Sequence, residues 1–242
     1  MPNRFGPRGV LALMIPQQNA NMQPEYEAMR PNGVSNQIYR FSLAVPDRVP
    51  EAVIASLPNA KGCFPDMIVC GNSLEMRHWS QQRQAIYLDE LKNAVPDVPI
   101  ITATEATETA LRTLGAKKVA VLSPMSETYS KSVAGFYGGL GFDVVSHHYL
   151  KVPVPEEIIN VPVEMIHGMF DEMDSPEVDC FLHVGGALGI VDFIDGLEEK
   201  LGRPVVSVNA ATYWYALRKL GVNDPLDRGG QITRLDLPEK FA

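Results

Sequence analysis

The stretch Asp66-Met-Ile-Val-Cys-Gly-Asn-Ser73 decides the fold, because its design returns later as Asp179-Cys-Phe-Leu-His-Val-Gly-Gly186. Each copy starts with an acidic residue and continues in a short apolar run that is typical of a buried parallel strand. Small or polar residues then follow where the next helix would begin. This pairing indicates that the chain is a duplication.

The rest of each half agrees with a duplication. Pro99 to Gly115 is echoed by Pro204 to Gly221, and both segments end in Ala-Leu-Arg-x-Leu-Gly. The openings match as well, since Val10 to Pro16 resembles Val119 to Pro124. Strand, loop and helix recur in one order, which predicts an α/β fold of two pseudo-symmetric halves, each a mostly parallel sheet flanked by helices.

The repeat also predicts the domain organisation. We expect residues 1–115 to form the first half, 116–213 to form the second, and 214–242 to pack back on the first. Neither a low-complexity segment nor a long linker separates the halves. The functional site is therefore predicted at their junction, where both halves would line it.

Composition excludes several classes of protein. A net charge of −8 and a pI near 5.1 oppose nucleic-acid binding. The apolar run Val10 to Ile15 is too short for a membrane span or a signal-peptide core, so no membrane is implied. The three cysteines, Cys63, Cys70 and Cys180, show neither CxxC spacing nor a disulfide framework, which predicts a cytoplasmic protein without a metal site.

Strand ends followed by small residues point to an anion site. Backbone N–H groups at a helix start have no partner within the helix, and the helix dipole adds partial positive charge. Such ends occur at Gly71-Asn72-Ser73, at Gly185-Gly186 and at Ser123 to Ser126, and the polar loop Gln17 to Asn21 also follows a strand. With neither a GxGxxG turn nor a Walker A lysine, small carboxylates fit better than nucleotides. The alternative is that these glycines only permit tight turns.

Together with Asn209 to Arg218, these motifs resemble the aspartate/glutamate racemase superfamily, in particular its arylmalonate decarboxylase and maleate isomerase branch. The resemblance spans Val10 to about Gly230. It implies two pseudo-symmetric halves, a site at their junction and no cofactor. It also implies that racemases and isomerases use one cysteine from each half, whereas decarboxylases keep the second cysteine and have glycine at the first position.

In this chain, the first cysteine position of the family falls on Gly71 and the second on Val184, so neither can transfer a proton. The internal repeat independently pairs the same two positions. A tyrosine that often follows the Ser-Pro turn in this branch is Met125 here. The residues predicted to bind substrate are Gln17, Asn19, Gly71, Asn72, Ser73, Met125, Ser126, Val184, Gly185 and Gly186.

The nearest candidates for a relocated acid are Cys70 and His183, each one residue before the expected position. Neighbouring residues in a regular strand point to opposite faces, so both would face away from the site unless a bulge turned them. The alternative is that Cys70 is a small core residue and His183 a hydrogen-bonded buried histidine.

The sequence therefore predicts a cofactor-independent lyase, decarboxylase-like, acting on a small carboxylate or malonate-type acid through an enediolate or carbanion in a cage of backbone amides. Two alternatives stay open: a racemase or maleate-type cis-trans isomerase, and a carboxylate-binding protein without catalysis. The expected partner is the small carboxylate itself. The oligomeric state is left open, a homo-oligomer included.

Overall fold

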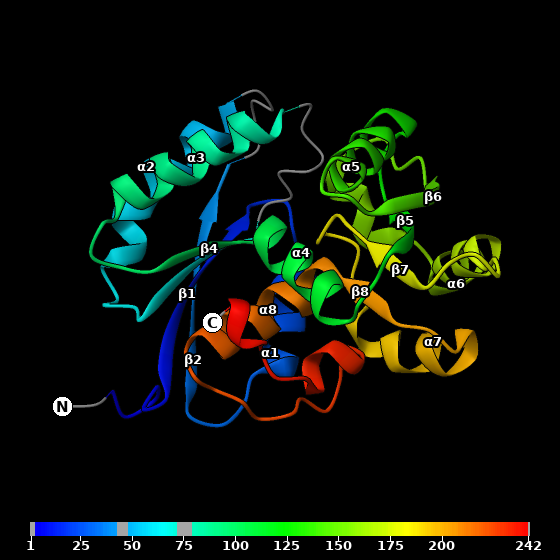
Figure 1. The fold of residues 1–242 in the computed structure, drawn as a ribbon. Coiled ribbons are helices and arrows are strands. Elements are labelled where there is room, and N and C mark those ends of the chain that lie inside the picture. Colours follow the sequence, from blue (N-terminus) through cyan, green and yellow to red (C-terminus); the bar gives the residue numbers. More distant parts are fainter. Residues whose placement is uncertain (1–2, 43–47, 72–78, 242) are drawn as a thin grey trace.

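The computed structural model describes residues 3–42, 48–71 and 79–241, which form two four-stranded parallel sheets flanked by helices (Figure 1). The strand order is β2-β1-β3-β4 in the first sheet and β6-β5-β7-β8 in the second. Each strand thus has a counterpart four strands later. The predicted α/β fold with two similar halves is confirmed.

The first sheet and its helices come from the first half of the chain. In chain order the elements are β1 (Gly9–Pro16), α1 (Met22–Met29), β2 (Val34–Phe41), α2 (Val49–Lys61), β3 (Met67–Cys70), α3 (Gln81–Ala94), β4 (Ile100–Thr102) and α4 (Ala103–Thr113).

The second sheet repeats this order and adds short 3-10 helices. Its elements are β5 (Lys118–Ser123), α5 (Glu127–Gly139), β6 (Asp143–Tyr149), η3 (Pro155–Asn160), α6 (Val163–Met173), β7 (Cys180–His183), η4 (Val191–Phe193), α7 (Ile194–Leu201), β8 (Val205–Ser207) and α8 (Val208–Lys219), followed by η5 (Gln231–Arg234) and η6 (Glu239–Phe241).

The acidic residues that open the repeated stretch have the same role in both halves. The backbone N–H of Val10 donates to Asp66 Oδ2 at 2.8 Å, and that of Lys118 donates to Asp179 Oδ2 at 2.9 Å. In return, the N–H groups of Asp66 and Asp179 donate to the carbonyl oxygens of Val10 and Lys118, both at 2.9 Å. Each carboxylate therefore ties the start of one strand to its neighbour.

The same bonding pattern makes positions 71 and 184 equivalent. Five residues after Asp66, the N–H of Gly71 donates to the carbonyl oxygen of Met14 at 3.1 Å. Five residues after Asp179, the N–H of Val184 donates to the carbonyl oxygen of Leu122 at 3.0 Å. Gly71 and Val184 thus stand at corresponding places just beyond the carboxyl ends of β3 and β7.

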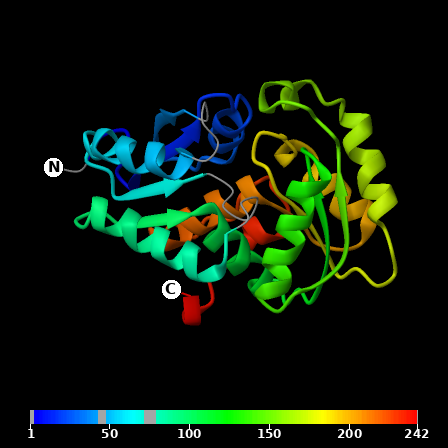
Figure 2. The ribbon, with the colours of Figure 1, turned by 90° about the horizontal axis from the view of Figure 1, so that it is seen from above.

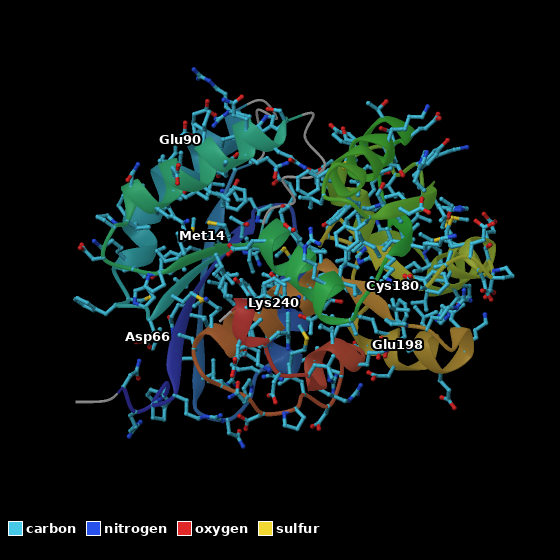
Figure 3. All side chains as sticks on the ribbon, viewed as in Figure 1. Met14, Asp66, Glu90, Cys180, Glu198 and Lys240 are labelled. Carbon is cyan, nitrogen blue, oxygen red and sulfur yellow. The ribbon has the colours of Figure 1, made fainter. Side chains whose placement is uncertain are left out.

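Two apolar cores hold the layers together. The smaller core lies between the first sheet and the helices α2 and α3, and Figure 3 labels one of its residues, Met14. Cys70 and Tyr87 belong to the same core. The larger core runs through both halves, with Met22 of α1 and Cys180 of β7 in one continuous cluster. A shared core of this kind fixes the halves relative to each other.

Helix α8 joins the second sheet to the first half. It is buried from Val208 to Arg218 because it packs against α1 and α4 (Figures 1 and 2). The hydroxyl of Tyr215 donates to Glu105 Oε1 of α4 at 3.1 Å. These contacts support the predicted packing of the C-terminal segment on the first half, although the division at residues 115 and 213 stays a prediction.

Two element boundaries differ from those that the sequence pattern predicts. The alternation of residues 37–45 predicts a strand there, whereas β2 runs from Val34 to Phe41, and residues 43–45 lie outside the described residues. A helix is predicted near residues 156–173, where Pro162 separates η3 from α6. Helix α1 was not expected. None of the helices in the described ranges is long and apolar enough to cross a membrane.

Candidate active site

The site begins with the loop that follows β1. Asn19 is buried, and its Oδ1 accepts hydrogen bonds from the N–H groups of Asn21 at 3.0 Å and Met22 at 2.9 Å. These bonds satisfy N–H groups at the start of α1 that have no partner within the helix. The Arg40 side chain donates to the Asn19 carbonyl at 2.8 Å and fixes the loop against β2. The loop therefore sets where α1 starts.

Helix α1 places Met22 between Gly71 of the first half and Gly186 of the second. A Cβ atom at position 71 would collide with Cε of Met22 and would lie 3.2 Å from the Met14 carbonyl oxygen. A Cβ atom at position 186 would collide with Asn209 Oδ1 and would lie 3.2 Å from Sδ of Met22. Met22 thus fills the space at the predicted junction, and only glycines permit this approach.

Glu25, one turn further along α1, ties this helix to the second half. Its Oε1 accepts hydrogen bonds from the N–H groups of Ile190 and Val191, both at 2.7 Å. Its Oε2 accepts from Asn209 Nδ2 at 2.5 Å. The N–H groups at the start of η4 therefore bind a carboxylate of the chain itself.

The electrostatic state of Glu25 follows from its burial. Removal from water raises the pKa of its carboxyl group from 4.5 to about 7, and the bonds from Asn209, Val191 and Ile190 only partly oppose that rise. Its charge therefore changes near neutral pH, at the contact between α1 and the second half.

Two polar atoms beside Met22 have no hydrogen-bond partner among the described residues: the Tyr26 hydroxyl and Oδ1 of Asn209. The Tyr26 hydroxyl lies 3.5 Å from the Cβ position at residue 71, and Asn209 Oδ1 adjoins Gly186. The other end of the Asn209 amide is bonded, since Nδ2 also donates to the Gly186 carbonyl at 2.9 Å. These two atoms, one from each side of the junction, both border the space that Met22 fills.

The two acids proposed from sequence lie inside the apolar cores. Cys70 is fully buried with the residues under α2 and α3, and burial raises the pKa of its thiol to about 12. His183 is fully buried, its Nδ1 lies 3.4 Å from the Ser207 hydroxyl, and burial lowers its pKa to about 3. No described contact brings either side chain to Met22.

The remaining predicted residues are spread over three loops. Gln17 and Ser126 are exposed, Met125 is half-buried, and Val184 is fully buried. Gly185 has φ of +95°, which glycine adopts without strain, and its carbonyl accepts the Leu188 N–H at 2.9 Å. Asn72 and Ser73 lie outside the described residues.

A cavity of about 360 Å³ lies on the other side of α1 from Gly71. It shares Glu25 with the arrangement around Met22 but is lined by none of the residues predicted to bind substrate. Its wall is about equally polar and apolar and comes from α1, η3, α6 and the segment before α7. The lining residues are Asn21, Pro24, Glu25, Ala28, Ile158, Ile159, Val161, Val163, Ile166, Leu188, Gly189, Asp192 and Phe193.

Metal-binding side chains do not gather at the junction: within 3–42, 48–71 and 79–241, no group of three or more His, Cys, Asp or Glu residues is arranged to hold an ion.

Comparison with known proteins identifies the family. Residues 44–233, most of the chain, match the family model described as arylmalonate decarboxylase. The chain belongs to the arylmalonate decarboxylase family. The predicted resemblance is thereby confirmed, as is the prediction of an enzyme that is either a lyase or an isomerase.

The curated relatives are maleate isomerases, which represent the other activity of this branch. The chain is 22% identical to a maleate isomerase of Pseudomonas putida over 245 residues, covering 90% of this chain and 94% of the relative. It is 25% identical to a maleate isomerase of Geobacillus stearothermophilus over 144 residues, which is 55% of this chain and 54% of that protein.

Solved structures have the same fold. A maleate isomerase variant from Pseudomonas putida S16 with maleate superposes with a TM-score of 0.82 at 19% identity, covering 93% of this chain and 97% of that one. Unliganded arylmalonate decarboxylase superposes with a TM-score of 0.80 at 19% identity, covering 93% of this chain and 98% of that one. At these identities the likeness concerns the fold.

The sequence analysis missed the side chains of α1 and Asn209. Met22, Tyr26 and Met29 follow the spacing i, i+4, i+7 of one helical face, and all three are buried. That spacing is the available signal, but the polar loop predicted over Gln17 to Asn21 ends just before it, and no element was predicted for the residues that follow. Asn209 was noticed only within a longer motif, without a role.

Proposed function

We propose that this member of the arylmalonate decarboxylase family is a cofactor-independent decarboxylase of a small malonate-type acid. The reaction breaks the bond between the α carbon and one carboxylate, and carbon dioxide leaves. The electron pair that stays behind is delocalised into the remaining carboxylate as an enediolate. Donors aimed at that developing charge stabilise it without a cofactor.

The observation that carries this proposal is the equivalence of Gly71 and Val184. They occupy matching backbone positions in the two halves, and neither has a group that can transfer a proton or add to a double bond. The three thiols lie elsewhere. Cys70 and Cys180 are buried in the cores. Cys63 lies in the loop that leads into β3, and its thiol donates to the Ala60 carbonyl of α2. Two-thiol chemistry is therefore disfavoured.

Met22 supports decarboxylation through the apolar surface that it presents between the halves. Its Cε adjoins Gly71 and its Sδ adjoins Gly186, so the space between the halves has an apolar wall. A carboxylate held against such a wall loses hydration, whereas neutral carbon dioxide does not depend on hydration. The apolar wall thus destabilises the charged carboxylate relative to neutral carbon dioxide and favours its loss as carbon dioxide.

The second candidate is cis-trans isomerisation of a small unsaturated diacid. It is favoured by the names of the curated relatives, which are maleate isomerases. A Nocardia farcinica maleate cis-trans isomerase has been solved with a covalently bound succinylcysteine intermediate, at a TM-score of 0.81. This chain would have to carry out such a reaction without a thiol at position 71 or 184.

Proton NMR in deuterated water distinguishes these functions. The protein is incubated with aryl- and alkyl-malonates, with maleate and with related small diacids. Decarboxylation gives a monoacid with one deuterium on the α carbon, which is the expected result. Conversion of maleate to fumarate would establish the isomerase instead, and line broadening of an added acid without turnover would favour a binding protein.

A further inference from the structure

The hydroxyl of Tyr26 has no role in holding the fold. The side chain is 1% exposed, and its hydroxyl has no hydrogen-bond partner among the described residues. A buried hydroxyl without a partner costs about 1–3 kcal/mol. Its ring alone accounts for the packing, because it stacks on Tyr213 with centroids 5.2 Å apart and planes at 19°. A phenylalanine would serve the fold better.

The Tyr26 hydroxyl lies close to the position where the first cysteine of the family would stand. Gly71 stands where the resemblance places the first cysteine of the family, and the Tyr26 hydroxyl lies 3.5 Å from the Cβ position of residue 71. It therefore reaches the junction from the first half, the side on which a thiol at position 71 would stand. Between it and the second half lies the end of the Met22 side chain, whose three rotatable bonds allow it to move aside.

We propose that the Tyr26 hydroxyl is the proton donor of this enzyme, a role that rests on the decarboxylase function proposed above. After carbon dioxide has left, the electron pair on the α carbon takes the hydroxyl proton, so that a C–H bond forms and the O–H bond of Tyr26 breaks. The phenolate then takes a proton from water when the product leaves. Atoms and charge balance with water as the only further reactant.

The surroundings keep this acid protonated until it is needed. Burial raises the pKa of Tyr26 well above its usual range, and the neighbouring Glu25 carboxyl raises it further. The Thr212 hydroxyl, which donates to the Val208 carbonyl at 2.6 Å, partly opposes this rise in the pKa of Tyr26. A neutral phenol is still a far stronger acid than the C–H bond of the product, so proton transfer to the carbanion is downhill.

The first test is Tyr26→Phe, which removes the hydroxyl and keeps the ring. Decarboxylation of a methyl aryl malonate is followed by NMR in deuterated water. We expect kcat to fall by about 100-fold or more, the usual contribution of a positioned general acid, with KM changed less than 3-fold. The melting temperature should stay equal or rise, because an unpartnered buried hydroxyl is lost. Tyr213→Phe is the matched control, since its hydroxyl donates to Asn36 on β2 at 3.0 Å and should leave kcat within 3-fold.

A rescue variant tests from which half of the protein the proton reaches the α carbon. Val184→Cys in the Tyr26→Phe background places a thiol on the second half, at the position equivalent to Gly71. Turnover should recover at least 10-fold, and the deuterated product should be the enantiomer opposite to that of the wild type, because the proton now arrives from the other face.

The outcomes separate the two proposals. Full kcat and unchanged enantiomeric excess in Tyr26→Phe would overturn the role of Tyr26 while leaving the decarboxylase intact. The same enantiomer from the rescue variant would also overturn it. A wild-type protein that converts no malonate in the panel would overturn the decarboxylase itself, and the role of Tyr26 with it.

Discussion

At the scale of single residues, Met22 controls how much space the junction offers. Its side chain is almost fully buried at the edge of the larger core, and its end lies against Gly71 and Gly186, where no side chain fills the space. A flexible thioether in such a place can be displaced by a ligand at low cost. The identity of residue 22 should therefore decide which substituents the substrate carries.

Met22→Ala tests this role. The variant should lose about 2 kcal/mol of unfolding free energy, at the low end for a buried methionine because water can enter and bond to Asn209 Oδ1. The ratio of kcat/KM for a bulky over a small α-substituent should rise about 10-fold. Met29→Ala is the control, because Met29 is also buried on α1 but its Sδ adjoins Gly229. If both variants change the ratio equally, Met22 does not set selectivity.

Gly71→Ala tests the contact from the other side. The added methyl group would collide with the end of the Met22 side chain, so the variant should lose about 1–3 kcal/mol of stability in urea. In the Met22→Ala background the same change should cost less than about 1 kcal/mol, because only the Met14 carbonyl at 3.2 Å then remains close. Equal costs in both backgrounds would contradict the placement of Met22.

At the scale of elements, α1 connects the two halves through the Glu25 carboxyl. The folded protein keeps the Glu25 proton up to about pH 7, whereas a free carboxyl loses it near 4.5. Between these values the folded state binds more protons than the unfolded chain, so its stability falls as the pH rises through this window. The contribution is fully present below about pH 4.5 and is lost above about pH 7.

Glu25→Gln should remove this dependence. Relative to wild type, the variant should gain about 3 kcal/mol of unfolding free energy between pH 5 and pH 8, since its amide is never charged. Burial also raises the pKa of Glu198, but that group is present in both proteins and its effect cancels. Urea titrations at several pH values measure the difference, with Glu27→Gln on the exposed side of α1 as control. Parallel curves for wild type and Glu25→Gln would show that the carboxyl does not titrate in this window.

The elements that could be predicted from the sequence are those that occur once in each half of the duplicated chain. The strands after Asp66 and Asp179 could be found because each is a continuous apolar run with an acidic start, and the bonds of both carboxylates explain why the acid is there. Helix α1 was missed because it has only eight residues, with Pro24 in its first turn and polar residues around it. Its stability comes from the tertiary contacts of Met22, Glu25 and Tyr26, which local sequence does not reveal.

The candidate site was predicted only in part for the same reason. Gly71 follows β3 directly and Gly186 lies shortly after the end of β7, so their place at the junction could be inferred from the duplication. Tyr26 and Asn209 come from α1 and α8, and only the packing of these helices against each other brings them near the glycines. A site built from two helices and two strand ends depends on the tertiary arrangement, which spacing within any one segment does not encode.

At the scale of the whole molecule, the duplicated halves share α8. This helix continues from β8 of the second sheet, but its side chains contact the first half: the Tyr213 hydroxyl donates to Asn36 and the Tyr215 hydroxyl to Glu105. Beyond it, Asp224 forms an ion pair with Arg8 near the start of the chain. Because the larger core is continuous through both halves, neither half would keep a complete core if the other unfolded.

The two tryptophans allow a direct test of this coupling. Trp79 lies in the outer layer of the first half, where its ring contacts Tyr87 with centroids 5.3 Å apart, and Trp214 is fully buried in α8. In Trp214→Phe the fluorescence of Trp79 reports the first half alone, and in Trp79→Phe that of Trp214 reports α8. For each variant we expect the fluorescence midpoint in urea to coincide with the midpoint measured by far-ultraviolet circular dichroism, because both halves unfold in one transition. A Trp79 signal that changes at clearly lower urea than the circular dichroism would show that the layer under α2 and α3 unfolds separately, and that the shared core does not couple it to the rest.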